Sequence, residues 1–345
     1  MSKDTKIVYS EPADYFPQEI RKKYKLGEYA ESDLLVKVKS VMIGHAVGDA
    51  LGVPVEFCSR EELDESPVTD MTGFGSYPVP AGAWSDDTSM TLAALDSLSK
   101  GVVDYDDIME NFVRWCSEDA YTPTGEMFDI GRTCLTAIRH YLATDDKPAL
   151  ECGLSDEHSN GNGSLMRIHP FVLYAYAKNL PFVEWLELIK NGSSITHSHD
   201  RSKLGCLIYA FVLYHLLADQ SRGAIENALA RAECHLRDCA ELSYYHRIFS
   251  SNFANLTREE IKSTGYVVDT LEAALWCLLT TKDYKSCVLK AVNLGDDTDT
   301  VAAVAGGLAG ILYGYDSIPL EWRNTLIKRE YIEAMCETAC DNWEK

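Results

Sequence analysis

Helical periodicity runs through nearly the whole of this 345-residue chain beyond its first thirty or so residues. From Ser32 to about Gly52 apolar side chains such as Val38, Val41 and Met42 recur at steps of three and four, as a buried helical face requires. The β-branched runs are short and lack hairpin turn signals, so the sequence predicts an all-α fold. Further helices are predicted at 86–100, 105–118, 130–143, 170–178, 182–191, 203–218, 222–238, 269–281, 284–293, 299–313 and 319–343, the last with internal breaks.

The domain organisation follows from what interrupts this pattern. Residues 1–31 carry no sustained periodicity and are predicted to form an N-terminal arm or extension. No repeat of fixed period and no Ser- or Gly-rich linker divides residues 32–345, which predicts a single compact, orthogonal multi-helix domain. Residues 53–83 form an irregular stretch rich in Pro and Gly, too long for a plain connector, so we expect this stretch to have a function.

Charge and cysteine usage restrict the partners and the compartment. The 32 basic and 53 acidic residues give a formal charge of -21, which repels nucleic acids and anionic lipid surfaces. Eleven cysteines without a C-x-x-C pair indicate reduced thiols in a cytosol. The N-terminus lacks a signal-peptide pattern, and the longest apolar runs, 204–218 and 301–313, are shorter than a membrane span. We therefore predict a cytoplasmic protein with neither a nucleic-acid nor a membrane partner.

Two acidic stretches, 84–88 and 295–300, come directly before apolar helices. Capping a helix explains one Asp in each, but five Asp are present, and crowded carboxylates repel unless a cation or proton lies among them. Carboxylate and hydroxyl oxygens suit Mg²⁺ or Mn²⁺, and the absence of a nearby His or Cys cluster argues against zinc. Asp297 and Asp299 are two apart and must project from a loop or a first turn. Two divalent cations are expected if the stretches meet in space.

Seven motifs in sequence order resemble the ADP-ribosylglycohydrolase family, which includes dinitrogenase reductase activating glycohydrolase and the ADP-ribosylhydrolases. They lie at 44–57, 84–88, 128–131, 161–167, 196–197, 265–267 and 295–300, so the resemblance spans roughly residues 36–315. It implies an all-α fold with two Mg²⁺ or Mn²⁺ ions in a cleft between the acidic stretches. The family more often has Thr at Ser85 and Gly at Asp296, and Asp296 is left outside the ligand set. The implied metal ligands are Ser85, Asp86, Asp87, Asp297, Asp299 and Thr300.

The resemblance also implies a reaction, the hydrolytic release of ADP-ribose from a modified protein side chain. A dinuclear site can grip ribose hydroxyls, polarise the leaving bond and lower the pKa of a bound water. Catalytic roles are implied for Glu56, in the loop after the first motif, and for Asp297. Family frequency slightly favours an arginine linkage over serine or other acceptors. The absence of a basic stripe favours a mono-ADP-ribosyl substrate, so the expected partners are an ADP-ribosylated protein and ADP-ribose.

Glycines in 161–164 would let backbone N–H groups approach a diphosphate and form an anion-binding nest, although such a stretch can also be an ordinary turn. Tyr266 would either stack on adenine or pack as a core tyrosine. The substrate-binding residues that the resemblance implies are Asp129, Gly131, Thr133, Gly161, Asn162, Gly163, Ser164, His197, Gly265, Tyr266 and Val267.

Three alternatives remain open at this level. The doublet His199-Asp200 is typical of HD-type phosphohydrolases, but we find no further ligands of that class in the sequence. A metal-dependent phosphohydrolase of a nucleotide or diphosphate would use the same ions. A catalytically inactive ADP-ribose-binding relative is disfavoured because all six implied ligand positions are intact.

Overall fold

The computed structural model describes residues 31–143 and 147–344. Within these ranges the chain forms helices joined by loops, and the extended pairings are two isolated β-bridges, Leu154 with His197 and Gly161 with Tyr266. The prediction of an all-α fold is therefore confirmed. The predicted arm, residues 1–31, lies outside the described residues apart from Glu31, which begins α2.

All but one of the predicted helical segments match a helix to within three residues at either end. The exception, 319–343, is divided in two, and Lys328 between the halves has a left-handed backbone with φ of 51°. The α-helices are α2 (Glu31–Gly52), α3 (Arg60–Glu65), α4 (Asp86–Leu98), α5 (Tyr105–Glu118), α6 (Arg132–Leu142), α7 (His169–Ala177), α8 (Phe182–Ser194), α9 (Asp200–Ala218), α10 (Arg222–Leu236), α11 (Val267–Thr280), α12 (Tyr284–Val292), α13 (Thr298–Tyr313), α14 (Leu320–Thr325) and α15 (Arg329–Trp343). The 3-10 helices are η1 (Val53–Val55), η2 (Ala149–Glu151), η3 (Ala240–Tyr245), η4 (Phe253–Asn255), η5 (Arg258–Glu260) and η6 (Tyr315–Ser317).

The stretch 53–83 is less irregular than predicted, because it contains η1 and α3. A capping box begins α3: the Ser59 hydroxyl accepts from the Glu62 N–H, and the Glu62 carboxylate accepts from the Ser59 N–H. This Ser-x-x-Glu pattern is a readable helix start. The sequence nevertheless predicted an irregular stretch here, because Pro and Gly residues surround this short pattern.

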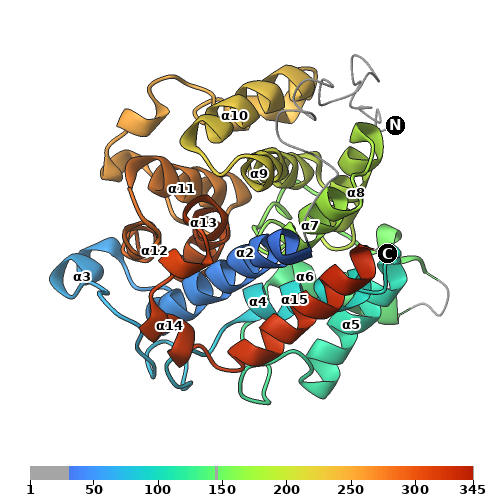
Figure 1. Ribbon diagram of the computed structural model, residues 1–345, viewed down its shortest axis with the longest axis horizontal. Coiled ribbons are helices and arrows are strands. Elements are labelled where there is room, and N and C mark those ends of the chain that lie inside the picture. The colour runs from blue at the N-terminus through green and yellow to red at the C-terminus, as the bar shows by residue number, and fades with distance from the viewer. Residues whose placement is uncertain (1–30, 144–146, 345) are drawn as a thin grey trace.

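The centre of the molecule is the antiparallel pair α2 and α13, which runs through the middle of Figure 1. Glycines allow the two backbones to touch. A Cβ at Gly48 would lie 2.1 Å from the Ala302 carbonyl oxygen, and one at Gly306 would lie 2.3 Å from the Gly44 carbonyl oxygen. The glycines of α13 thus serve close helix packing. The pairing sets the end of α2 beside the start of α13.

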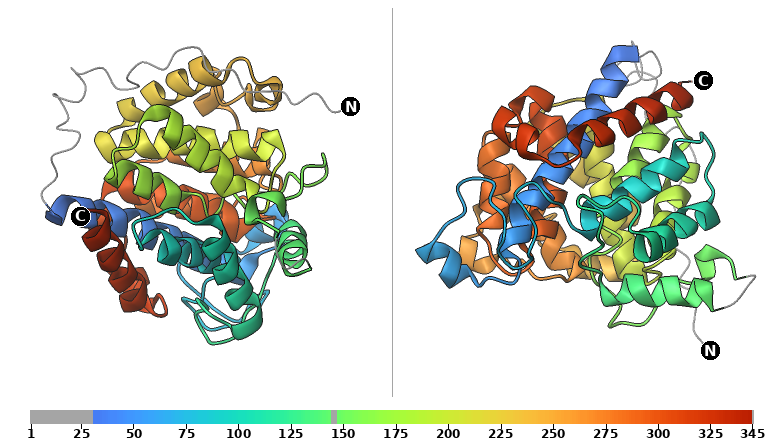
Figure 2. Two further views of the ribbon diagram at one scale, coloured as in Figure 1. Left: turned by 90° about the vertical axis from the view of Figure 1, so that its right-hand side faces the viewer. Right: turned by 90° about the horizontal axis from the view of Figure 1, so that it is seen from below.

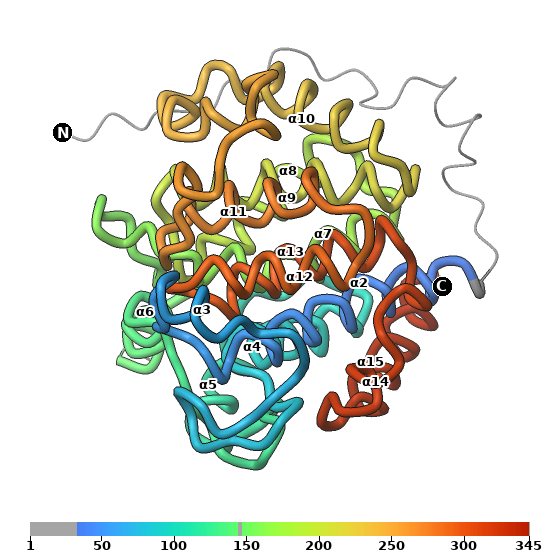
Figure 3. Tube along the Cα trace, turned by 90° about the vertical axis from the view of Figure 1, so that its left-hand side faces the viewer, coloured from blue at the N-terminus to red at the C-terminus, as the bar shows by residue number. Residues whose placement is uncertain are grey.

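The other helices form layers around this pair. α9, α11 and α12 pack on α13, while α4 and α15 pack on α2. Figure 3 shows α10 at the top, then α9 and α11, then α13 with α2, and α4 with α5 toward the bottom. The left-hand view of Figure 2 shows α10 above α2, and α4 and α5 below it. Among the described helices, none combines the length and the apolar character needed to cross a membrane.

Candidate active site

The two acidic stretches meet where the ends of the central helices converge. The Thr300 hydroxyl donates a hydrogen bond of 3.3 Å to Asp87 Oδ2, which joins the start of α13 to the start of α4. One carboxylate oxygen each of Glu56, Asp297 and Asp299 lies within 4.8 Å of the other two. Segments far apart in the chain therefore share one acidic cluster.

Helix capping explains only part of this arrangement. Ser85 is the N-cap of α4 and accepts from the Asp87 N–H, while its own hydroxyl donates to Asp87 Oδ2 at 3.1 Å. Asp297 occupies the N-cap position of α13, yet its side chain makes no capping hydrogen bond. Asp299 follows in the first turn of α13, as the two-residue spacing predicts. The carboxylate of Asp297 is thus available for another role.

Burial makes the charged forms of several carboxylates at the site unfavourable, as the pKa values of Glu56 and four aspartates show. It raises the pKa of Glu56 to about 8, and the neighbouring charge of Asp129 adds to the effect. Burial likewise raises the pKa of Asp129 to about 6, with the Asp297 charge as the next cause. The pKa values of Asp86, Asp87 and Asp299 are raised far above the usual range, first by burial and then by neighbouring carboxylates.

The cluster fits a divalent cation. Three buried oxygens, Glu56 Oε2, Asp87 Oδ1 and Asp299 Oδ2, have no hydrogen-bond partner among the described residues. Such orphaned acceptors are costly unless a proton or a cation satisfies them. Carboxylate and hydroxyl oxygens are hard donors that Mg²⁺ and Mn²⁺ accept.

The metal-free protein is therefore expected to lose stability as the pH rises. Between the ordinary pKa of 4.5 and the folded value of about 8, folded Glu56 holds a proton that the unfolded chain has released. Stability is then fully present below about pH 4.5 and declines up to about pH 8. Urea unfolding in EDTA at several pH values measures this decline. Mn²⁺ should oppose it, and stability that increases with pH in EDTA would contradict it.

Two loops expected to bind substrate contact these acids directly. Asn162 Nδ2 donates to Asp297 Oδ2 at 2.7 Å, and the Gly131 N–H donates to Asp86 Oδ2 at 3.4 Å. Gly265 lies beside the Asp297 carboxylate, since a Cβ at Gly265 would be 3.1 Å from Asp297 Oδ2. The segments 129–133, 161–164 and 265–267 are thus gathered around the acidic cluster.

The expected substrate-binding residues differ in how open they are. Tyr266 is half-buried, with the Arg201 guanidinium 6.0 Å from its ring centre, so it is not a core tyrosine. Gly131 is exposed and a Cβ there would meet open space, and Gly161, Asp129 and Thr133 are half-buried. These residues are accessible to a ligand.

Others lie behind the loop surface. His197 is only 1% exposed, its Nδ1 lies 2.8 Å from the Thr196 hydroxyl, and burial lowers its pKa to about 3. A Cβ at Gly163 would lie 3.0 Å from its ring. Ser164 is fully buried and accepts from the Ser193 hydroxyl, and Val267 is buried at the start of α11. The structure places His197, Ser164 and Val267 as supports beneath the loops.

Two residues of the site were not assigned from the sequence. Asp49, buried in α2, accepts from the Ser85 N–H at 2.9 Å and from the Thr88 N–H and hydroxyl at 3.0 and 2.6 Å. It thereby caps α4 from another helix. Tyr77 lies near the carboxylates of Glu56 and Asp129, and burial together with their charges raises the pKa of its hydroxyl well above the usual value. A carboxylate in a buried helix was a signal for Asp49, whereas nothing in the sequence around Tyr77 indicated its position.

Asp49→Asn is expected to weaken divalent-cation binding by about 10- to 100-fold, the usual cost of losing a group that orients metal ligands. The amide would direct an N–H₂ group at donors of the turn that carries Asp86 and Asp87. Calorimetric titration with Mn²⁺ measures the change. Ser97→Ala, a buried substitution at the far end of α4, is the matched control. Equal Mn²⁺ affinities in the two variants would refute this role of Asp49.

The fold and the acidic cluster define a member of the ADP-ribosylglycohydrolase class. The model of the ADP-ribosylglycohydrolase family matches residues 30–345, so the chain belongs to this family, which is metal-dependent. A solved chain described as an ADP-ribosylglycohydrolase-related protein complex superposes with a TM-score of 0.75 at 32% identity, covering 91% of this chain and 100% of that one.

The chain is also similar to two relatives whose names state an activity. An ADP-ribosylarginine hydrolase of Serratia proteamaculans is 34% identical over 308 residues, covering 89% of this chain and 80% of the relative. An ADP-ribosyl-[dinitrogen reductase] glycohydrolase of Rhodospirillum rubrum is 33% identical over 287 residues, covering 82% and 88%.

Proposed function

We propose that this protein is a metal-dependent hydrolase that releases ADP-ribose from a mono-ADP-ribosylated arginine side chain. The observation that carries the proposal is the convergence of Glu56, Asp297 and Asp299 with the start of α4, inside a ring of loops suited to ligand binding. Membership of the family and the names of the two relatives support the reaction, and the name of the Serratia proteamaculans relative supports the arginine linkage. The substrates would be ADP-ribosylated proteins.

Two divalent cations, Mg²⁺ or Mn²⁺, would be held by the oxygens at the starts of α4 and α13. When bound, the ions supply Lewis acidity toward the ribose and an acidified water. Asn162 supports this arrangement by its hydrogen bond to Asp297, which fixes the orientation of that carboxylate. The residues that would hold the ions are Ser85, Asp86, Asp87, Asp297, Asp299 and Thr300.

Hydrolysis adds a water oxygen to the anomeric carbon of the distal ribose and breaks its bond to the guanidine nitrogen. One proton must pass from the water to that nitrogen. Glu56 is suited to carry it, because burial raises the pKa of its carboxyl to about 8 and its Oε2 has no partner among the described residues. Tyr77, which lies near the same carboxyl, would help to hold it in place.

The loops would bind the ADP part of the substrate. Glycines at 161 and 163 let the backbone approach a diphosphate, and Asn162 is fixed there because its N–H donates to the Gly265 carbonyl at 3.0 Å. Gly131, exposed at the N-cap of α6, adds a helix start whose N–H groups favour an anion. The half-buried ring of Tyr266 would stack on adenine.

The decisive experiment incubates the protein with arginine-linked and serine-linked ADP-ribosyl substrates in Mg²⁺, Mn²⁺ or EDTA. Free ADP-ribose from the arginine substrate, lost in EDTA, is the expected result. Release from the serine substrate alone would refute the arginine linkage. AMP or phosphate as product would indicate a phosphohydrolase, and no product with either cation would indicate an inactive ADP-ribose-binding protein.

A further inference from the structure

We propose that Arg60 is a positioning residue that holds the catalytic, substrate-binding and metal-binding loops in register. This inference rests on the function proposed above and concerns a side chain that touches neither substrate nor acidic cluster in that account. Arg60 begins α3, four residues after Glu56. Its guanidinium joins the Glu56 segment to two distant loops.

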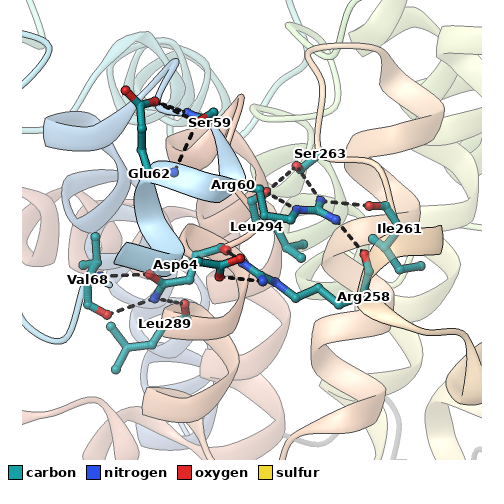
Figure 4. Close-up of polar contacts among 11 residues, drawn as sticks. Ser59, Arg60, Glu62, Asp64, Val68, Arg258, Ile261, Ser263, Leu289 and Leu294 are labelled. Atoms are coloured by element: carbon teal, nitrogen blue, oxygen red, sulfur yellow. Dashed lines mark hydrogen bonds and ion pairs between the residues drawn. The ribbon is translucent and has the colours of Figure 1, made fainter. Parts of the chain in front are cut away.

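Four hydrogen bonds define the contact, and Figure 4 shows them converging on one guanidinium. Arg60 Nε donates to the Leu294 carbonyl at 2.8 Å, and Nη1 donates to the Arg258 carbonyl at 2.7 Å. Nη2 donates to the Ile261 carbonyl at 2.9 Å and to the Ser263 hydroxyl at 3.4 Å. Leu294 lies three residues before Asp297, and Ser263 lies two residues before Gly265.

The two distant loops are also bonded to each other at this point. The Ser263 hydroxyl donates to the Leu294 carbonyl at 3.1 Å, and the Ser263 carbonyl accepts from the Asp297 N–H at 3.0 Å. A shift of the Arg60 acceptors would therefore reach the backbone of Asp297. Gly265, whose lack of a side chain makes room for the Asp297 carboxylate, belongs to the same connection.

The Glu56 segment is bonded to the metal-binding loop as well. The Phe57 N–H donates to the Asp296 carbonyl at 2.7 Å, and the Asp296 N–H donates to the Cys58 carbonyl at 2.8 Å. Gly295, with φ of +80°, passes so close to α3 that a Cβ would lie 2.8 Å from the backbone nitrogen of Arg60. Backbone contacts therefore set the spacing between Glu56 and Asp297. The hydrogen bond from Arg60 to Leu294 adds a side-chain contact to this set.

A second arginine reinforces the arrangement. Arg258, whose carbonyl accepts from Arg60, donates to Asp64 Oδ1 and to the Asn293 carbonyl, both at 2.6 Å (Figure 4). It thus ties the end of α3 to the segment that leads to Leu294. Only a guanidinium offers five donors in a planar fork, so a lysine at position 60 can replace part of the contacts at most.

The expected consequence of removing the guanidinium is a loss of alignment rather than of binding groups. A displacement of about 1 Å at a reacting centre can cost about 100-fold in rate. Because Arg60 does not contact the substrate in this account, the effect should fall on kcat and on cation affinity more than on KM. A residue that contributed to stability alone would leave these constants unchanged in the folded protein.

The test compares Arg60→Met and Arg60→Lys with Arg222→Met. Arg222 also bonds to carbonyls, of Leu279 and Thr281, and to the Tyr313 hydroxyl. Arg222 begins α10 and contacts Tyr313 at the far end of α13, about 21 Å along that helix from Asp299 at 1.5 Å per residue. It is therefore a matched substitution remote from the site.

Folded Arg60→Met is expected to bind Mn²⁺ about 10-fold more weakly in calorimetric titration and to lose about 10- to 100-fold in kcat. KM should change less than kcat, Arg60→Lys should recover part of both losses, and Arg222→Met should match the wild type. Wild-type Mn²⁺ affinity in Arg60→Met, or an equal loss in Arg222→Met, would overturn the proposal. If the wild type hydrolyses no ADP-ribosyl substrate, the proposed function fails, while the Mn²⁺ titrations still decide the role of Arg60.

Discussion

Asp297→Asn is expected to abolish the release of ADP-ribose, with a loss on the order of 1000-fold or more, and to weaken Mn²⁺ binding. The substitution removes a negative charge from the group of oxygens shared with Glu56 and Asp299. In the wild type, Asn162 Nδ2 donates to Asp297 Oδ2 at 2.7 Å. An NH₂ group of the new amide at this position would be a second donor in place of the acceptor. Both changes disfavour a cation at the start of α13.

Asp296→Asn is the matched control, because it makes the same chemical change one residue away. Asp296 is exposed and has φ of 61°, a left-handed conformation that Asn tolerates. Its backbone, rather than its carboxylate, makes the contacts to Phe57 and Cys58. Product release by both variants, with Mn²⁺ titrations alongside, separates the two positions. Full activity in Asp297→Asn, or equal loss in both, would refute the assignment of Asp297.

Glu56→Gln is expected to lower kcat by about 100- to 10,000-fold, the usual contribution of a general acid or base. Glutamine keeps the shape and one carbonyl oxygen but cannot carry the proton that hydrolysis moves. Mn²⁺ binding should stay within a few-fold of the wild type, because the substitution leaves all six proposed ligand residues unchanged. Since burial raises the pKa of Glu56 to about 8, the variant should also flatten the decline in stability of the metal-free protein between about pH 5 and about pH 8.

Single-turnover hydrolysis, Mn²⁺ titration and urea unfolding in EDTA measure these three effects separately. Glu61→Gln, an exposed position in the first turn of α3, is the control for the loss of one glutamate charge near the site. It should match the wild type in all three measurements. Wild-type turnover in Glu56→Gln would remove Glu56 from the catalytic role and leave Asp297 as the only predicted catalytic residue.

Local signals in the sequence accounted for most of the fold. The periodic apolar stripes placed the long helices to within a few residues, because burial of one face is what stabilises an amphipathic helix. Short elements were harder, as α3 shows, because six residues carry too little periodicity to stand out from a Pro- and Gly-rich loop. The contacts of Gly44 and Gly48 with α13 could be named only from the structure, because they join residues more than 250 positions apart.

The sequence by itself determined an all-α chain with two acidic helix starts, because period, capping and charge are properties of neighbouring residues. Only the tertiary structure decided that these starts share one cluster with Glu56, that Asp49 and Tyr77 lie beside the cluster, and that Arg60 bonds to the loop that leads to Asp297. The physical reason is that such contacts join residues distant in the chain: Asp49 and Ser85 are 36 positions apart, and Arg60 and Leu294 are 234 positions apart. They form only when the antiparallel packing of α2 on α13 has brought the chain segments together.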